Sequence, residues 1–146
     1  MALFDWNKIY CTDVAIIDEH HMYLFELINS MHRAAKERNG NEKLDNLFKE
    51  LLENIFFHFK KEEELMSKCR YPEFQLHRLE HDNLTRNLLE FRGKFKDGNT
   101  FASAEVAKFL KSWLTIHILQ TDMKFAKHFK TVQHLQNQTG VQKNAG

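Results

Sequence analysis

Six polar side chains interrupt the apolar stripes of the predicted helical segments, where leucine or isoleucine would be expected. Burying an unpartnered polar group costs a few kcal/mol, and a folded domain is stable by only about 5–15 kcal/mol. A core that held all six without a shared partner would hardly fold, so the sequence predicts that something neutralises them together. The six residues are His21, His58, Glu62, His77, His81 and His117.

The spacing of these residues indicates a metal centre. His58 and Glu62 lie one helical turn apart, as do His77 and His81, and an i,i+4 pair points two ligand groups at one place in the core. Imidazoles and carboxylates without thiolates suit iron, zinc, copper or manganese. A single four-coordinate zinc ion would leave some of these six side chains without a metal, so the number of candidate ligands favours two metal ions.

Asp122 is a seventh candidate with an irregular spacing. It follows His117 by five residues, which places the two side chains about 140° apart on a regular helix of roughly 100° per residue. Asp122 reaches the same site only if the helix carries a π-bulge there, a feature often found at functional sites. On spacing alone, a solvated aspartate is an equally good interpretation.

Four helices must position these residues. Apolar positions recur at alternating steps of three and four, which is typical of helices packed in a bundle. Pro72 suits the first turn of the third helix, and Ser103 suits the N-cap of the fourth. Short loops between long helices predict an all-α, up-down-up-down antiparallel four-helix bundle. The predicted helices run from about residue 19 to 37, 42 to 68, 72 to 95 and 103 onwards.

The chain is long enough, at 146 residues, for one well-packed domain and too short for two comfortable ones. We expect that domain to span residues 1–131. Within it, residues 1–18 form an arm that is too apolar for a free tail, and we expect the arm to pack along the bundle. Residues 132–146 are rich in Gln, Asn and Gly, and we expect them to form a polar tail that is frayed or disordered.

Composition excludes several classes of protein. Twenty-one basic and twenty acidic residues leave a net charge of +1, which argues against a nucleic-acid binder. No secretory signal is visible, and no apolar run approaches the roughly 18 residues of a membrane span. Two cysteines without a C-x-x-C motif give no support to a disulfide scaffold. We therefore expect a cytoplasmic protein with no nucleic-acid partner and no membrane span, and take the monomer as the default state.

The motifs that contain these residues resemble those of the hemerythrin family, specifically its single-domain bacterial members, from about Leu3 to Phe129. IDEHHMYLF (17–25) is similar to the family's I-D-x-Q-H-x-x-L-F, and HFKKEEELM (58–66) to its H-F-x-x-E-E-x-L-M. YPEFQLHRLEH (71–81) is similar to Y-P-x-x-x-x-H-x-x-x-H, and WLTIHILQTD (113–122) to W-L-x-x-H-I-x-x-x-D. Four motifs in the right order are far more specific than any one of them.

The resemblance implies a non-haem di-iron site with an oxo or hydroxo bridge, at which dioxygen binds. The ligands of one iron would be His77, His81 and His117. The ligands of the other iron, which keeps a position open for dioxygen, would be His21 and His58. The carboxylates that bridge both irons would be Glu62 and Asp122. By the same analogy, the oxygen pocket would be lined by Leu24, Phe59, Trp113, Leu114 and Ile118.

One residue departs from the family pattern. His20 stands where the family usually has Gln. Because His21 keeps the three-residue step to Leu24, we expect His21 and not His20 to be the ligand. The four histidines outside the candidate site are expected at the surface: His20, His32, His128 and His134.

The function that this resemblance implies is reversible dioxygen binding by a carrier, storage or delivery protein that is not an enzyme. Ferritin-like oxidases use paired E-x-x-H motifs, and the sequence contains none. Two alternatives stay open: a di-iron enzyme that reduces nitric oxide or peroxide, and a module that senses oxygen or iron. A need for an electron donor would distinguish an enzyme from a carrier. For a delivery protein, the expected partner is an oxygen-consuming enzyme.

Overall fold

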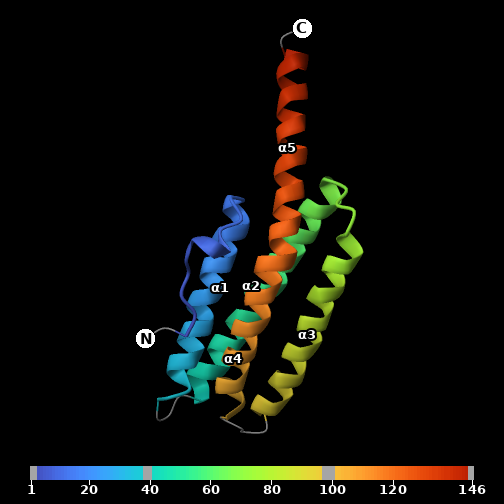
Figure 1. Ribbon diagram of the computed structural model, residues 1–146. Coiled ribbons are helices and arrows are strands. Elements are labelled where there is room, and N and C mark those ends of the chain that lie inside the picture. Colours follow the sequence, from blue (N-terminus) through green and yellow to red (C-terminus); the bar gives the residue numbers. More distant parts are fainter. Residues whose placement is uncertain (1–2, 38–40, 97–100, 145–146) are drawn as a thin grey trace.

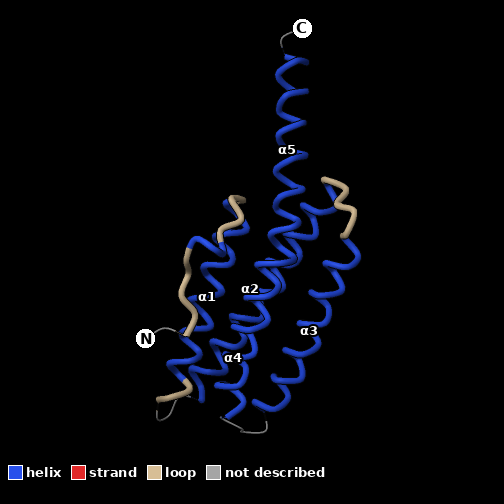
Figure 2. Tube along the Cα trace, viewed as in Figure 1, coloured by secondary structure: helices blue, strands red, loops and turns tan. Residues whose placement is uncertain are grey.

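Four antiparallel helical rods surround a common core in the computed structural model (Figure 1), which describes residues 3–37, 41–96 and 101–144. Figure 2 shows helices and loops and no strand in these ranges. The helices are α1 (Ala15–Ala34), α2 (Asn41–Lys68), α3 (Phe74–Lys96), α4 (Phe101–Ile116) and α5 (Met123–Asn144), with a short 3-10 helix η1 (Lys8–Tyr10) and a π-helix η2 (His117–Asp122).

The topology is the one that the apolar periodicity predicts. Helices α4 and α5 and the π-helix η2 between them form one continuous rod, so the chain makes four rods that run alternately in opposite directions (Figure 1). Helix α1 packs against α2 and α4, and α3 packs against the same two helices on the other side. The predicted all-α antiparallel four-helix bundle is confirmed.

The bounds of α2 agree with the predicted ones, whereas the starts of α3 and α4 differ from them. Arg70 has a left-handed backbone with φ 53°, and the amide of Tyr71 donates to the carbonyl of Met66 at 2.9 Å, which is the Schellman motif that ends α2. Pro72 lies in the next turn, which the amide of Phe74 closes by donating to the carbonyl of Tyr71 at 3.2 Å, so Pro72 precedes α3 instead of occupying its first turn. Ser103, the predicted N-cap, lies inside α4, which begins at Phe101. The two interhelical turns were expected at residues 38–41 and 96–100. Residues 38–40 and 97–100 lie outside the described residues, whereas Asn41 and Lys96 belong to α2 and α3.

The N-terminal arm packs along the bundle, as predicted. The ring of Phe4 stacks on Phe25 of α1 with centroids 3.5 Å apart, and Asn29 exchanges two hydrogen bonds with the backbone of Phe4 at 2.8 and 2.7 Å. Near the start of α1, the buried carboxylate of Asp18 accepts from the backbone N–H and the hydroxyl of Thr12 at 2.9 and 2.7 Å. Both ends of the arm are therefore tied to the first helix.

The core is divided into two apolar clusters. The larger one, the main apolar cluster, includes Ile55 and Ile118. The second apolar cluster includes Met66 and Phe125. Along α2 the candidate residues His58 and Glu62 occur between Ile55 and Met66. The candidate polar residues therefore form a layer, which we call the polar layer, with one apolar cluster on each side of it.

Helix α5 continues beyond the bundle to Asn144 (Figure 1). Residues 132–144 are thus helical, whereas their composition suggested a frayed or disordered tail. Residues 133–138 are exposed, which accounts for the missing apolar period: this part of the helix has no face to bury. Among the described residues, none of the helices combines the length and the apolar character needed to cross a membrane.

Candidate metal centre

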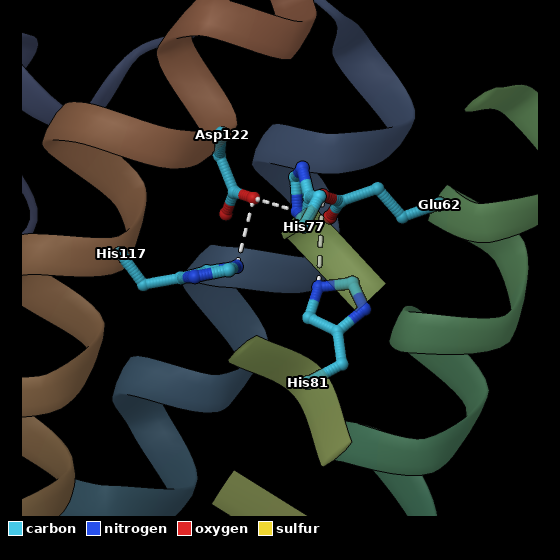
Figure 3. A group of neighbouring side chains, drawn as sticks. All are labelled: Glu62, His77, His81, His117 and Asp122. Carbon is cyan, nitrogen blue, oxygen red and sulfur yellow. Dashed lines mark ion pairs between the residues drawn. The ribbon is translucent and has the colours of Figure 1, made fainter. Parts of the chain in front are cut away.

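All seven candidate residues lie in the polar layer, and none of them is more than 3% exposed. Figure 3 shows five of them pointing toward one another from α2, α3 and the two ends of η2. Every one of the four rods contributes at least one side chain. The contributions are His21 from α1, His58 and Glu62 from α2, His77 and His81 from α3, and His117 and Asp122 from η2.

The π-helix η2 brings Asp122 into the centre. It spans six residues and has His117 and Asp122 at its two ends, with 3.0 Å between Nε2 of His117 and Oδ1 of Asp122. A regular helix would separate the two side chains by about 140°, whereas the wider turn aligns them. The predicted π-bulge is confirmed, and the solvated interpretation of Asp122 is wrong, since its side chain is fully buried.

The ligand atoms fall into two groups that share both carboxylates. Within each group, the ligand atoms all lie within 4.8 Å of one another. We call the first the three-histidine group; it consists of Glu62, His77, His81, His117 and Asp122. We call the second the two-histidine group; it consists of His21, His58, Glu62 and Asp122.

Glu62 directs its two oxygens at different groups. Its Oε2 lies 2.9 Å from Nε2 of His58 in the two-histidine group. Its Oε1 lies 2.5 Å from Nε2 of His77 and 3.8 Å from Nε2 of His81 in the three-histidine group. One carboxylate thus faces both groups at once.

Asp122 does the same from the opposite side. Its Oδ2 lies 3.0 Å from Nε2 of His21, and its Oδ1 lies 3.0 Å from Nε2 of both His77 and His117. Because each carboxylate has one oxygen in each group, the arrangement suits two metal ions with two bridging carboxylates.

Several atoms of the centre are buried without a hydrogen-bond partner. They include both carboxylate oxygens of Glu62 and of Asp122, and Nε2 of His77, His81 and His117. These atoms approach one another closely, yet their directions do not meet hydrogen-bond geometry, because they converge on shared points in space. Buried polar atoms are nearly always satisfied, so the orphaned atoms fit a metal ion that accepts their lone pairs. The nitrogen and oxygen donors suit iron.

In the metal-free protein, protons hold this cluster together. Burial lowers the pKa of His77, but the neighbouring carboxylates of Asp122 and Glu62 outweigh burial and raise it to about 10. Burial likewise lowers the pKa of His117, and Asp122 and Glu80 raise it to about 9. Burial raises the pKa of the Asp122 carboxyl, but His117 and its neighbours hold that pKa well below its ordinary value. Two imidazolium ions thereby balance the two carboxylates.

Residues outside the candidate set make hydrogen bonds to the outer nitrogens of three histidines. Glu63 Oε2 lies 3.2 Å from Nδ1 of His81, and Glu80 Oε2 lies 2.6 Å from Nδ1 of His117. Sequence periodicity does not reveal either glutamate, since each reaches a histidine on a different helix. His20, which was expected at the surface, is half-buried and contacts His58 instead. His32 and His128 are also half-buried, and of the four only His134 is exposed.

The residues predicted to line the oxygen pocket border the polar layer. Leu24, Leu114 and Ile118 are buried in the main apolar cluster. The rings of Phe59 and Trp113 stack on histidines of the three-histidine group. Phe59 lies over His81 with centroids 3.8 Å apart, and Trp113 lies over His117 at 4.3 Å. The two aromatic rings therefore shield the three-histidine side of the centre.

Two surface pockets reach the edge of the three-histidine group. One has a volume of about 430 Å³ and is lined by residues that include Phe59, Glu63 and His81. The other measures about 250 Å³ and includes His77 and Glu80. Each pocket is thus lined by one histidine of this group and by one of the two glutamates.

Comparison with known proteins agrees with this geometry. A family model described as "Hemerythrin HHE cation binding domain" matches residues 12–129. A bacteriohemerythrin from Methylococcus capsulatus is 31% identical over 123 residues, which cover 84% of this chain and 93% of that protein. A bacteriohemerythrin from Pseudomonas aeruginosa is 27% identical over 146 residues, covering 100% and 92%. A crystal structure of wild-type hemerythrin has a TM-score of 0.80 at 28% identity, covering 88% of this chain and 98% of that one. The chain belongs to the hemerythrin family.

Proposed function

We propose that this chain binds dioxygen reversibly at a di-iron centre and acts as an oxygen carrier, storage or delivery protein. The observation that carries the proposal is the placement of the two carboxylates. Glu62 and Asp122 each have one oxygen in the two-histidine group and one in the three-histidine group, as two bridges between two metal ions require. Membership of the hemerythrin family supports iron as the metal.

The two groups differ in the number of ligands that they offer. The three-histidine group has five residues and the two-histidine group has four. His77, His81 and His117 would hold one iron together with the two carboxylates. His21 and His58 would hold the other, which would keep a position for dioxygen beside an oxo or hydroxo group. When bound, the two irons supply the two electrons that dioxygen takes up and returns on release.

The chain itself keeps the centre dry and limits its charge. Neutral imidazoles add no charge, so the two carboxylates and a hydroxide bridge leave only a small net charge around two Fe²⁺ ions. The proposed oxygen pocket lies in the main apolar cluster, where Leu24 and Ile118 are 1% and 0% exposed. Such a lining excludes the water and protons that would divert bound oxygen into side reactions.

The test is optical spectroscopy with a metal count. We expect two irons per chain and charge-transfer bands in air that vanish on deoxygenation and return on re-aeration without an electron donor. One iron per chain, or bands that never return, would refute the carrier. Turnover of nitric oxide or peroxide with an electron donor would point to the enzyme alternative.

Single substitutions test the ligand set. His77→Ala and Glu62→Ala should abolish loading of two irons, because each removes a group that no neighbour can replace. His134→Ala is the matched control. Because His134 is exposed on α5, this substitution should leave loading unchanged.

Cys11 and Cys69 are both free thiols, and we therefore also propose a cytoplasmic location. For a delivery protein, we propose an oxygen-consuming enzyme as the partner.

A further inference from the structure

Two consecutive histidines of α1 contact opposite nitrogens of one histidine on α2. Nε2 of His21 lies 3.1 Å from Nε2 of His58, and Nδ1 of His20 lies 2.9 Å from Nδ1 of His58. The rings of His20 and His58 are nearly perpendicular, at 87°, with centroids 5.1 Å apart. His58 is thus held on its inner side by the centre and on its outer side by His20.

The centre determines the direction of the outer hydrogen bond. Nε2 of His58 faces inward, 2.9 Å from Oε2 of Glu62. A nitrogen that binds a metal cannot keep its proton, so the proton of neutral His58 must lie on Nδ1. His58 then donates from Nδ1, and Nδ1 of His20 accepts. This leaves the ring proton of His20 on Nε2.

The acceptor that His58 meets differs in kind from the acceptors in the three-histidine group. His81 and His117 face the carboxylates of Glu63 and Glu80 through their outer nitrogens. A carboxylate acceptor raises the basicity of a ligating imidazole more than a neutral acceptor does. The outer contacts are therefore anionic at His81 and His117 and neutral at His58.

We propose that His20 is a positioning residue for the metal position of the two-histidine group. As a neutral acceptor for the Nδ1–H of His58, it fixes the His58 ring with Nε2 facing the centre. The inference rests on the proposed function, because it takes His58 as a ligand. An amide oxygen can accept the same hydrogen bond. A glutamine at position 20 should therefore also fix the orientation of the His58 ring, whereas an alanine should not.

Nuclear magnetic resonance of the Zn²⁺-loaded protein tests the hydrogen bond directly. Zn²⁺ is diamagnetic and takes imidazole and carboxylate ligands. With ¹⁵N-labelled histidine, we expect His58 as the Nδ1–H form, His20 as the Nε2–H form, and a scalar coupling between their Nδ1 atoms. His20 as the Nδ1–H form, or the absence of this coupling in protein loaded with two ions, would overturn the proposal.

Zn²⁺ titrations of three variants test the consequence. His20→Ala should weaken the binding of one of the two ions by about 10–100-fold, the usual effect of losing such a partner. The ¹⁵N signals of His58 and His77 identify which position has lost affinity, and it should be that of His58. His20→Gln should restore most of the affinity, and His134→Ala should match the wild type.

The outcomes separate the two proposals. If His20→Ala binds both ions like the wild type, or if His20→Gln is as weak as His20→Ala, the role of His20 is refuted while the centre stands. If the wild-type protein takes up fewer than two Zn²⁺ ions, the proposed two-metal centre itself fails, and the role of His20 fails with it.

Discussion

Metal loading should release at least two protons per chain at pH 7. In the metal-free protein the carboxylates raise the pKa of His77 to about 10 and that of His117 to about 9. Both imidazoles are therefore protonated at pH 7. A metal ligand must be deprotonated, so each of these two histidines gives up a proton when the ion enters. A hydroxide bridge formed from water would add a third.

The proton release makes metal affinity depend on pH. Each proton released changes the apparent free energy of loading by about 1.36 kcal/mol per pH unit. Two protons make the loading of both ions about 2.7 kcal/mol more favourable for each unit of rising pH. The slope holds while the pH stays below the pKa of His117 and becomes shallower above it, because the metal-free protein then loses the protons by itself.

Isothermal titration calorimetry with Zn²⁺ measures this quantity. Titrations at pH 7 in two buffers with different ionisation enthalpies give the number of protons released per chain. The Asp122→Asn variant lacks a charge that raises both pKa values, so it should release fewer protons, and His134→Ala should release as many as the wild type. Fewer than two protons from a wild-type chain that takes up two ions would refute this account of the metal-free cluster.

Three further predictions concern the metal-free histidines, the contact between Asp18 and Thr12, and the end of α5. The pKa values of His77 and His117 rise from 6.5 in the unfolded chain to about 10 and about 9 in the folded, metal-free protein. The resulting stabilisation of the fold is complete below pH 6.5 and is lost as the pH rises through 9 and 10. Thermal unfolding of metal-free protein should therefore shift to lower temperature between pH 6.5 and 10, and a shift to higher temperature would contradict the pKa assignment. Asp18→Ala removes the acceptor of the buried Thr12 N–H and the closer of the two acceptors of its hydroxyl. The substitution should cost about 1–3 kcal/mol in urea denaturation, whereas an effect no larger than that of Asp18→Asn would show that the contact is unimportant. A chain truncated after residue 131 should still bind two ions and change in stability by less than about 0.5 kcal/mol; loss of metal binding would show that residues 132–146 belong to the domain.

The sequence determined the four helices and the set of residues that meet between them. The alternating three- and four-residue spacing of apolar residues decides which face of each helix is buried, and the candidate residues occupy that face. The spacing of His117 and Asp122 predicted that Asp122 joins the centre only through a π-bulge. These relations lie within single helices, where the number of residues per turn alone sets the direction of each side chain.

Only the tertiary structure decided the relations between helices. Which oxygen of Glu62 faces which group, and which residues meet the outer nitrogens of the histidines, depend on how far one helix slides and rotates against its neighbour. Glu63, Glu80 and His20 each contact a histidine on another rod, and no sequence period encodes such a contact. Periodicity therefore specified which residues line the centre, and the packing of the four rods specified what each of them contacts.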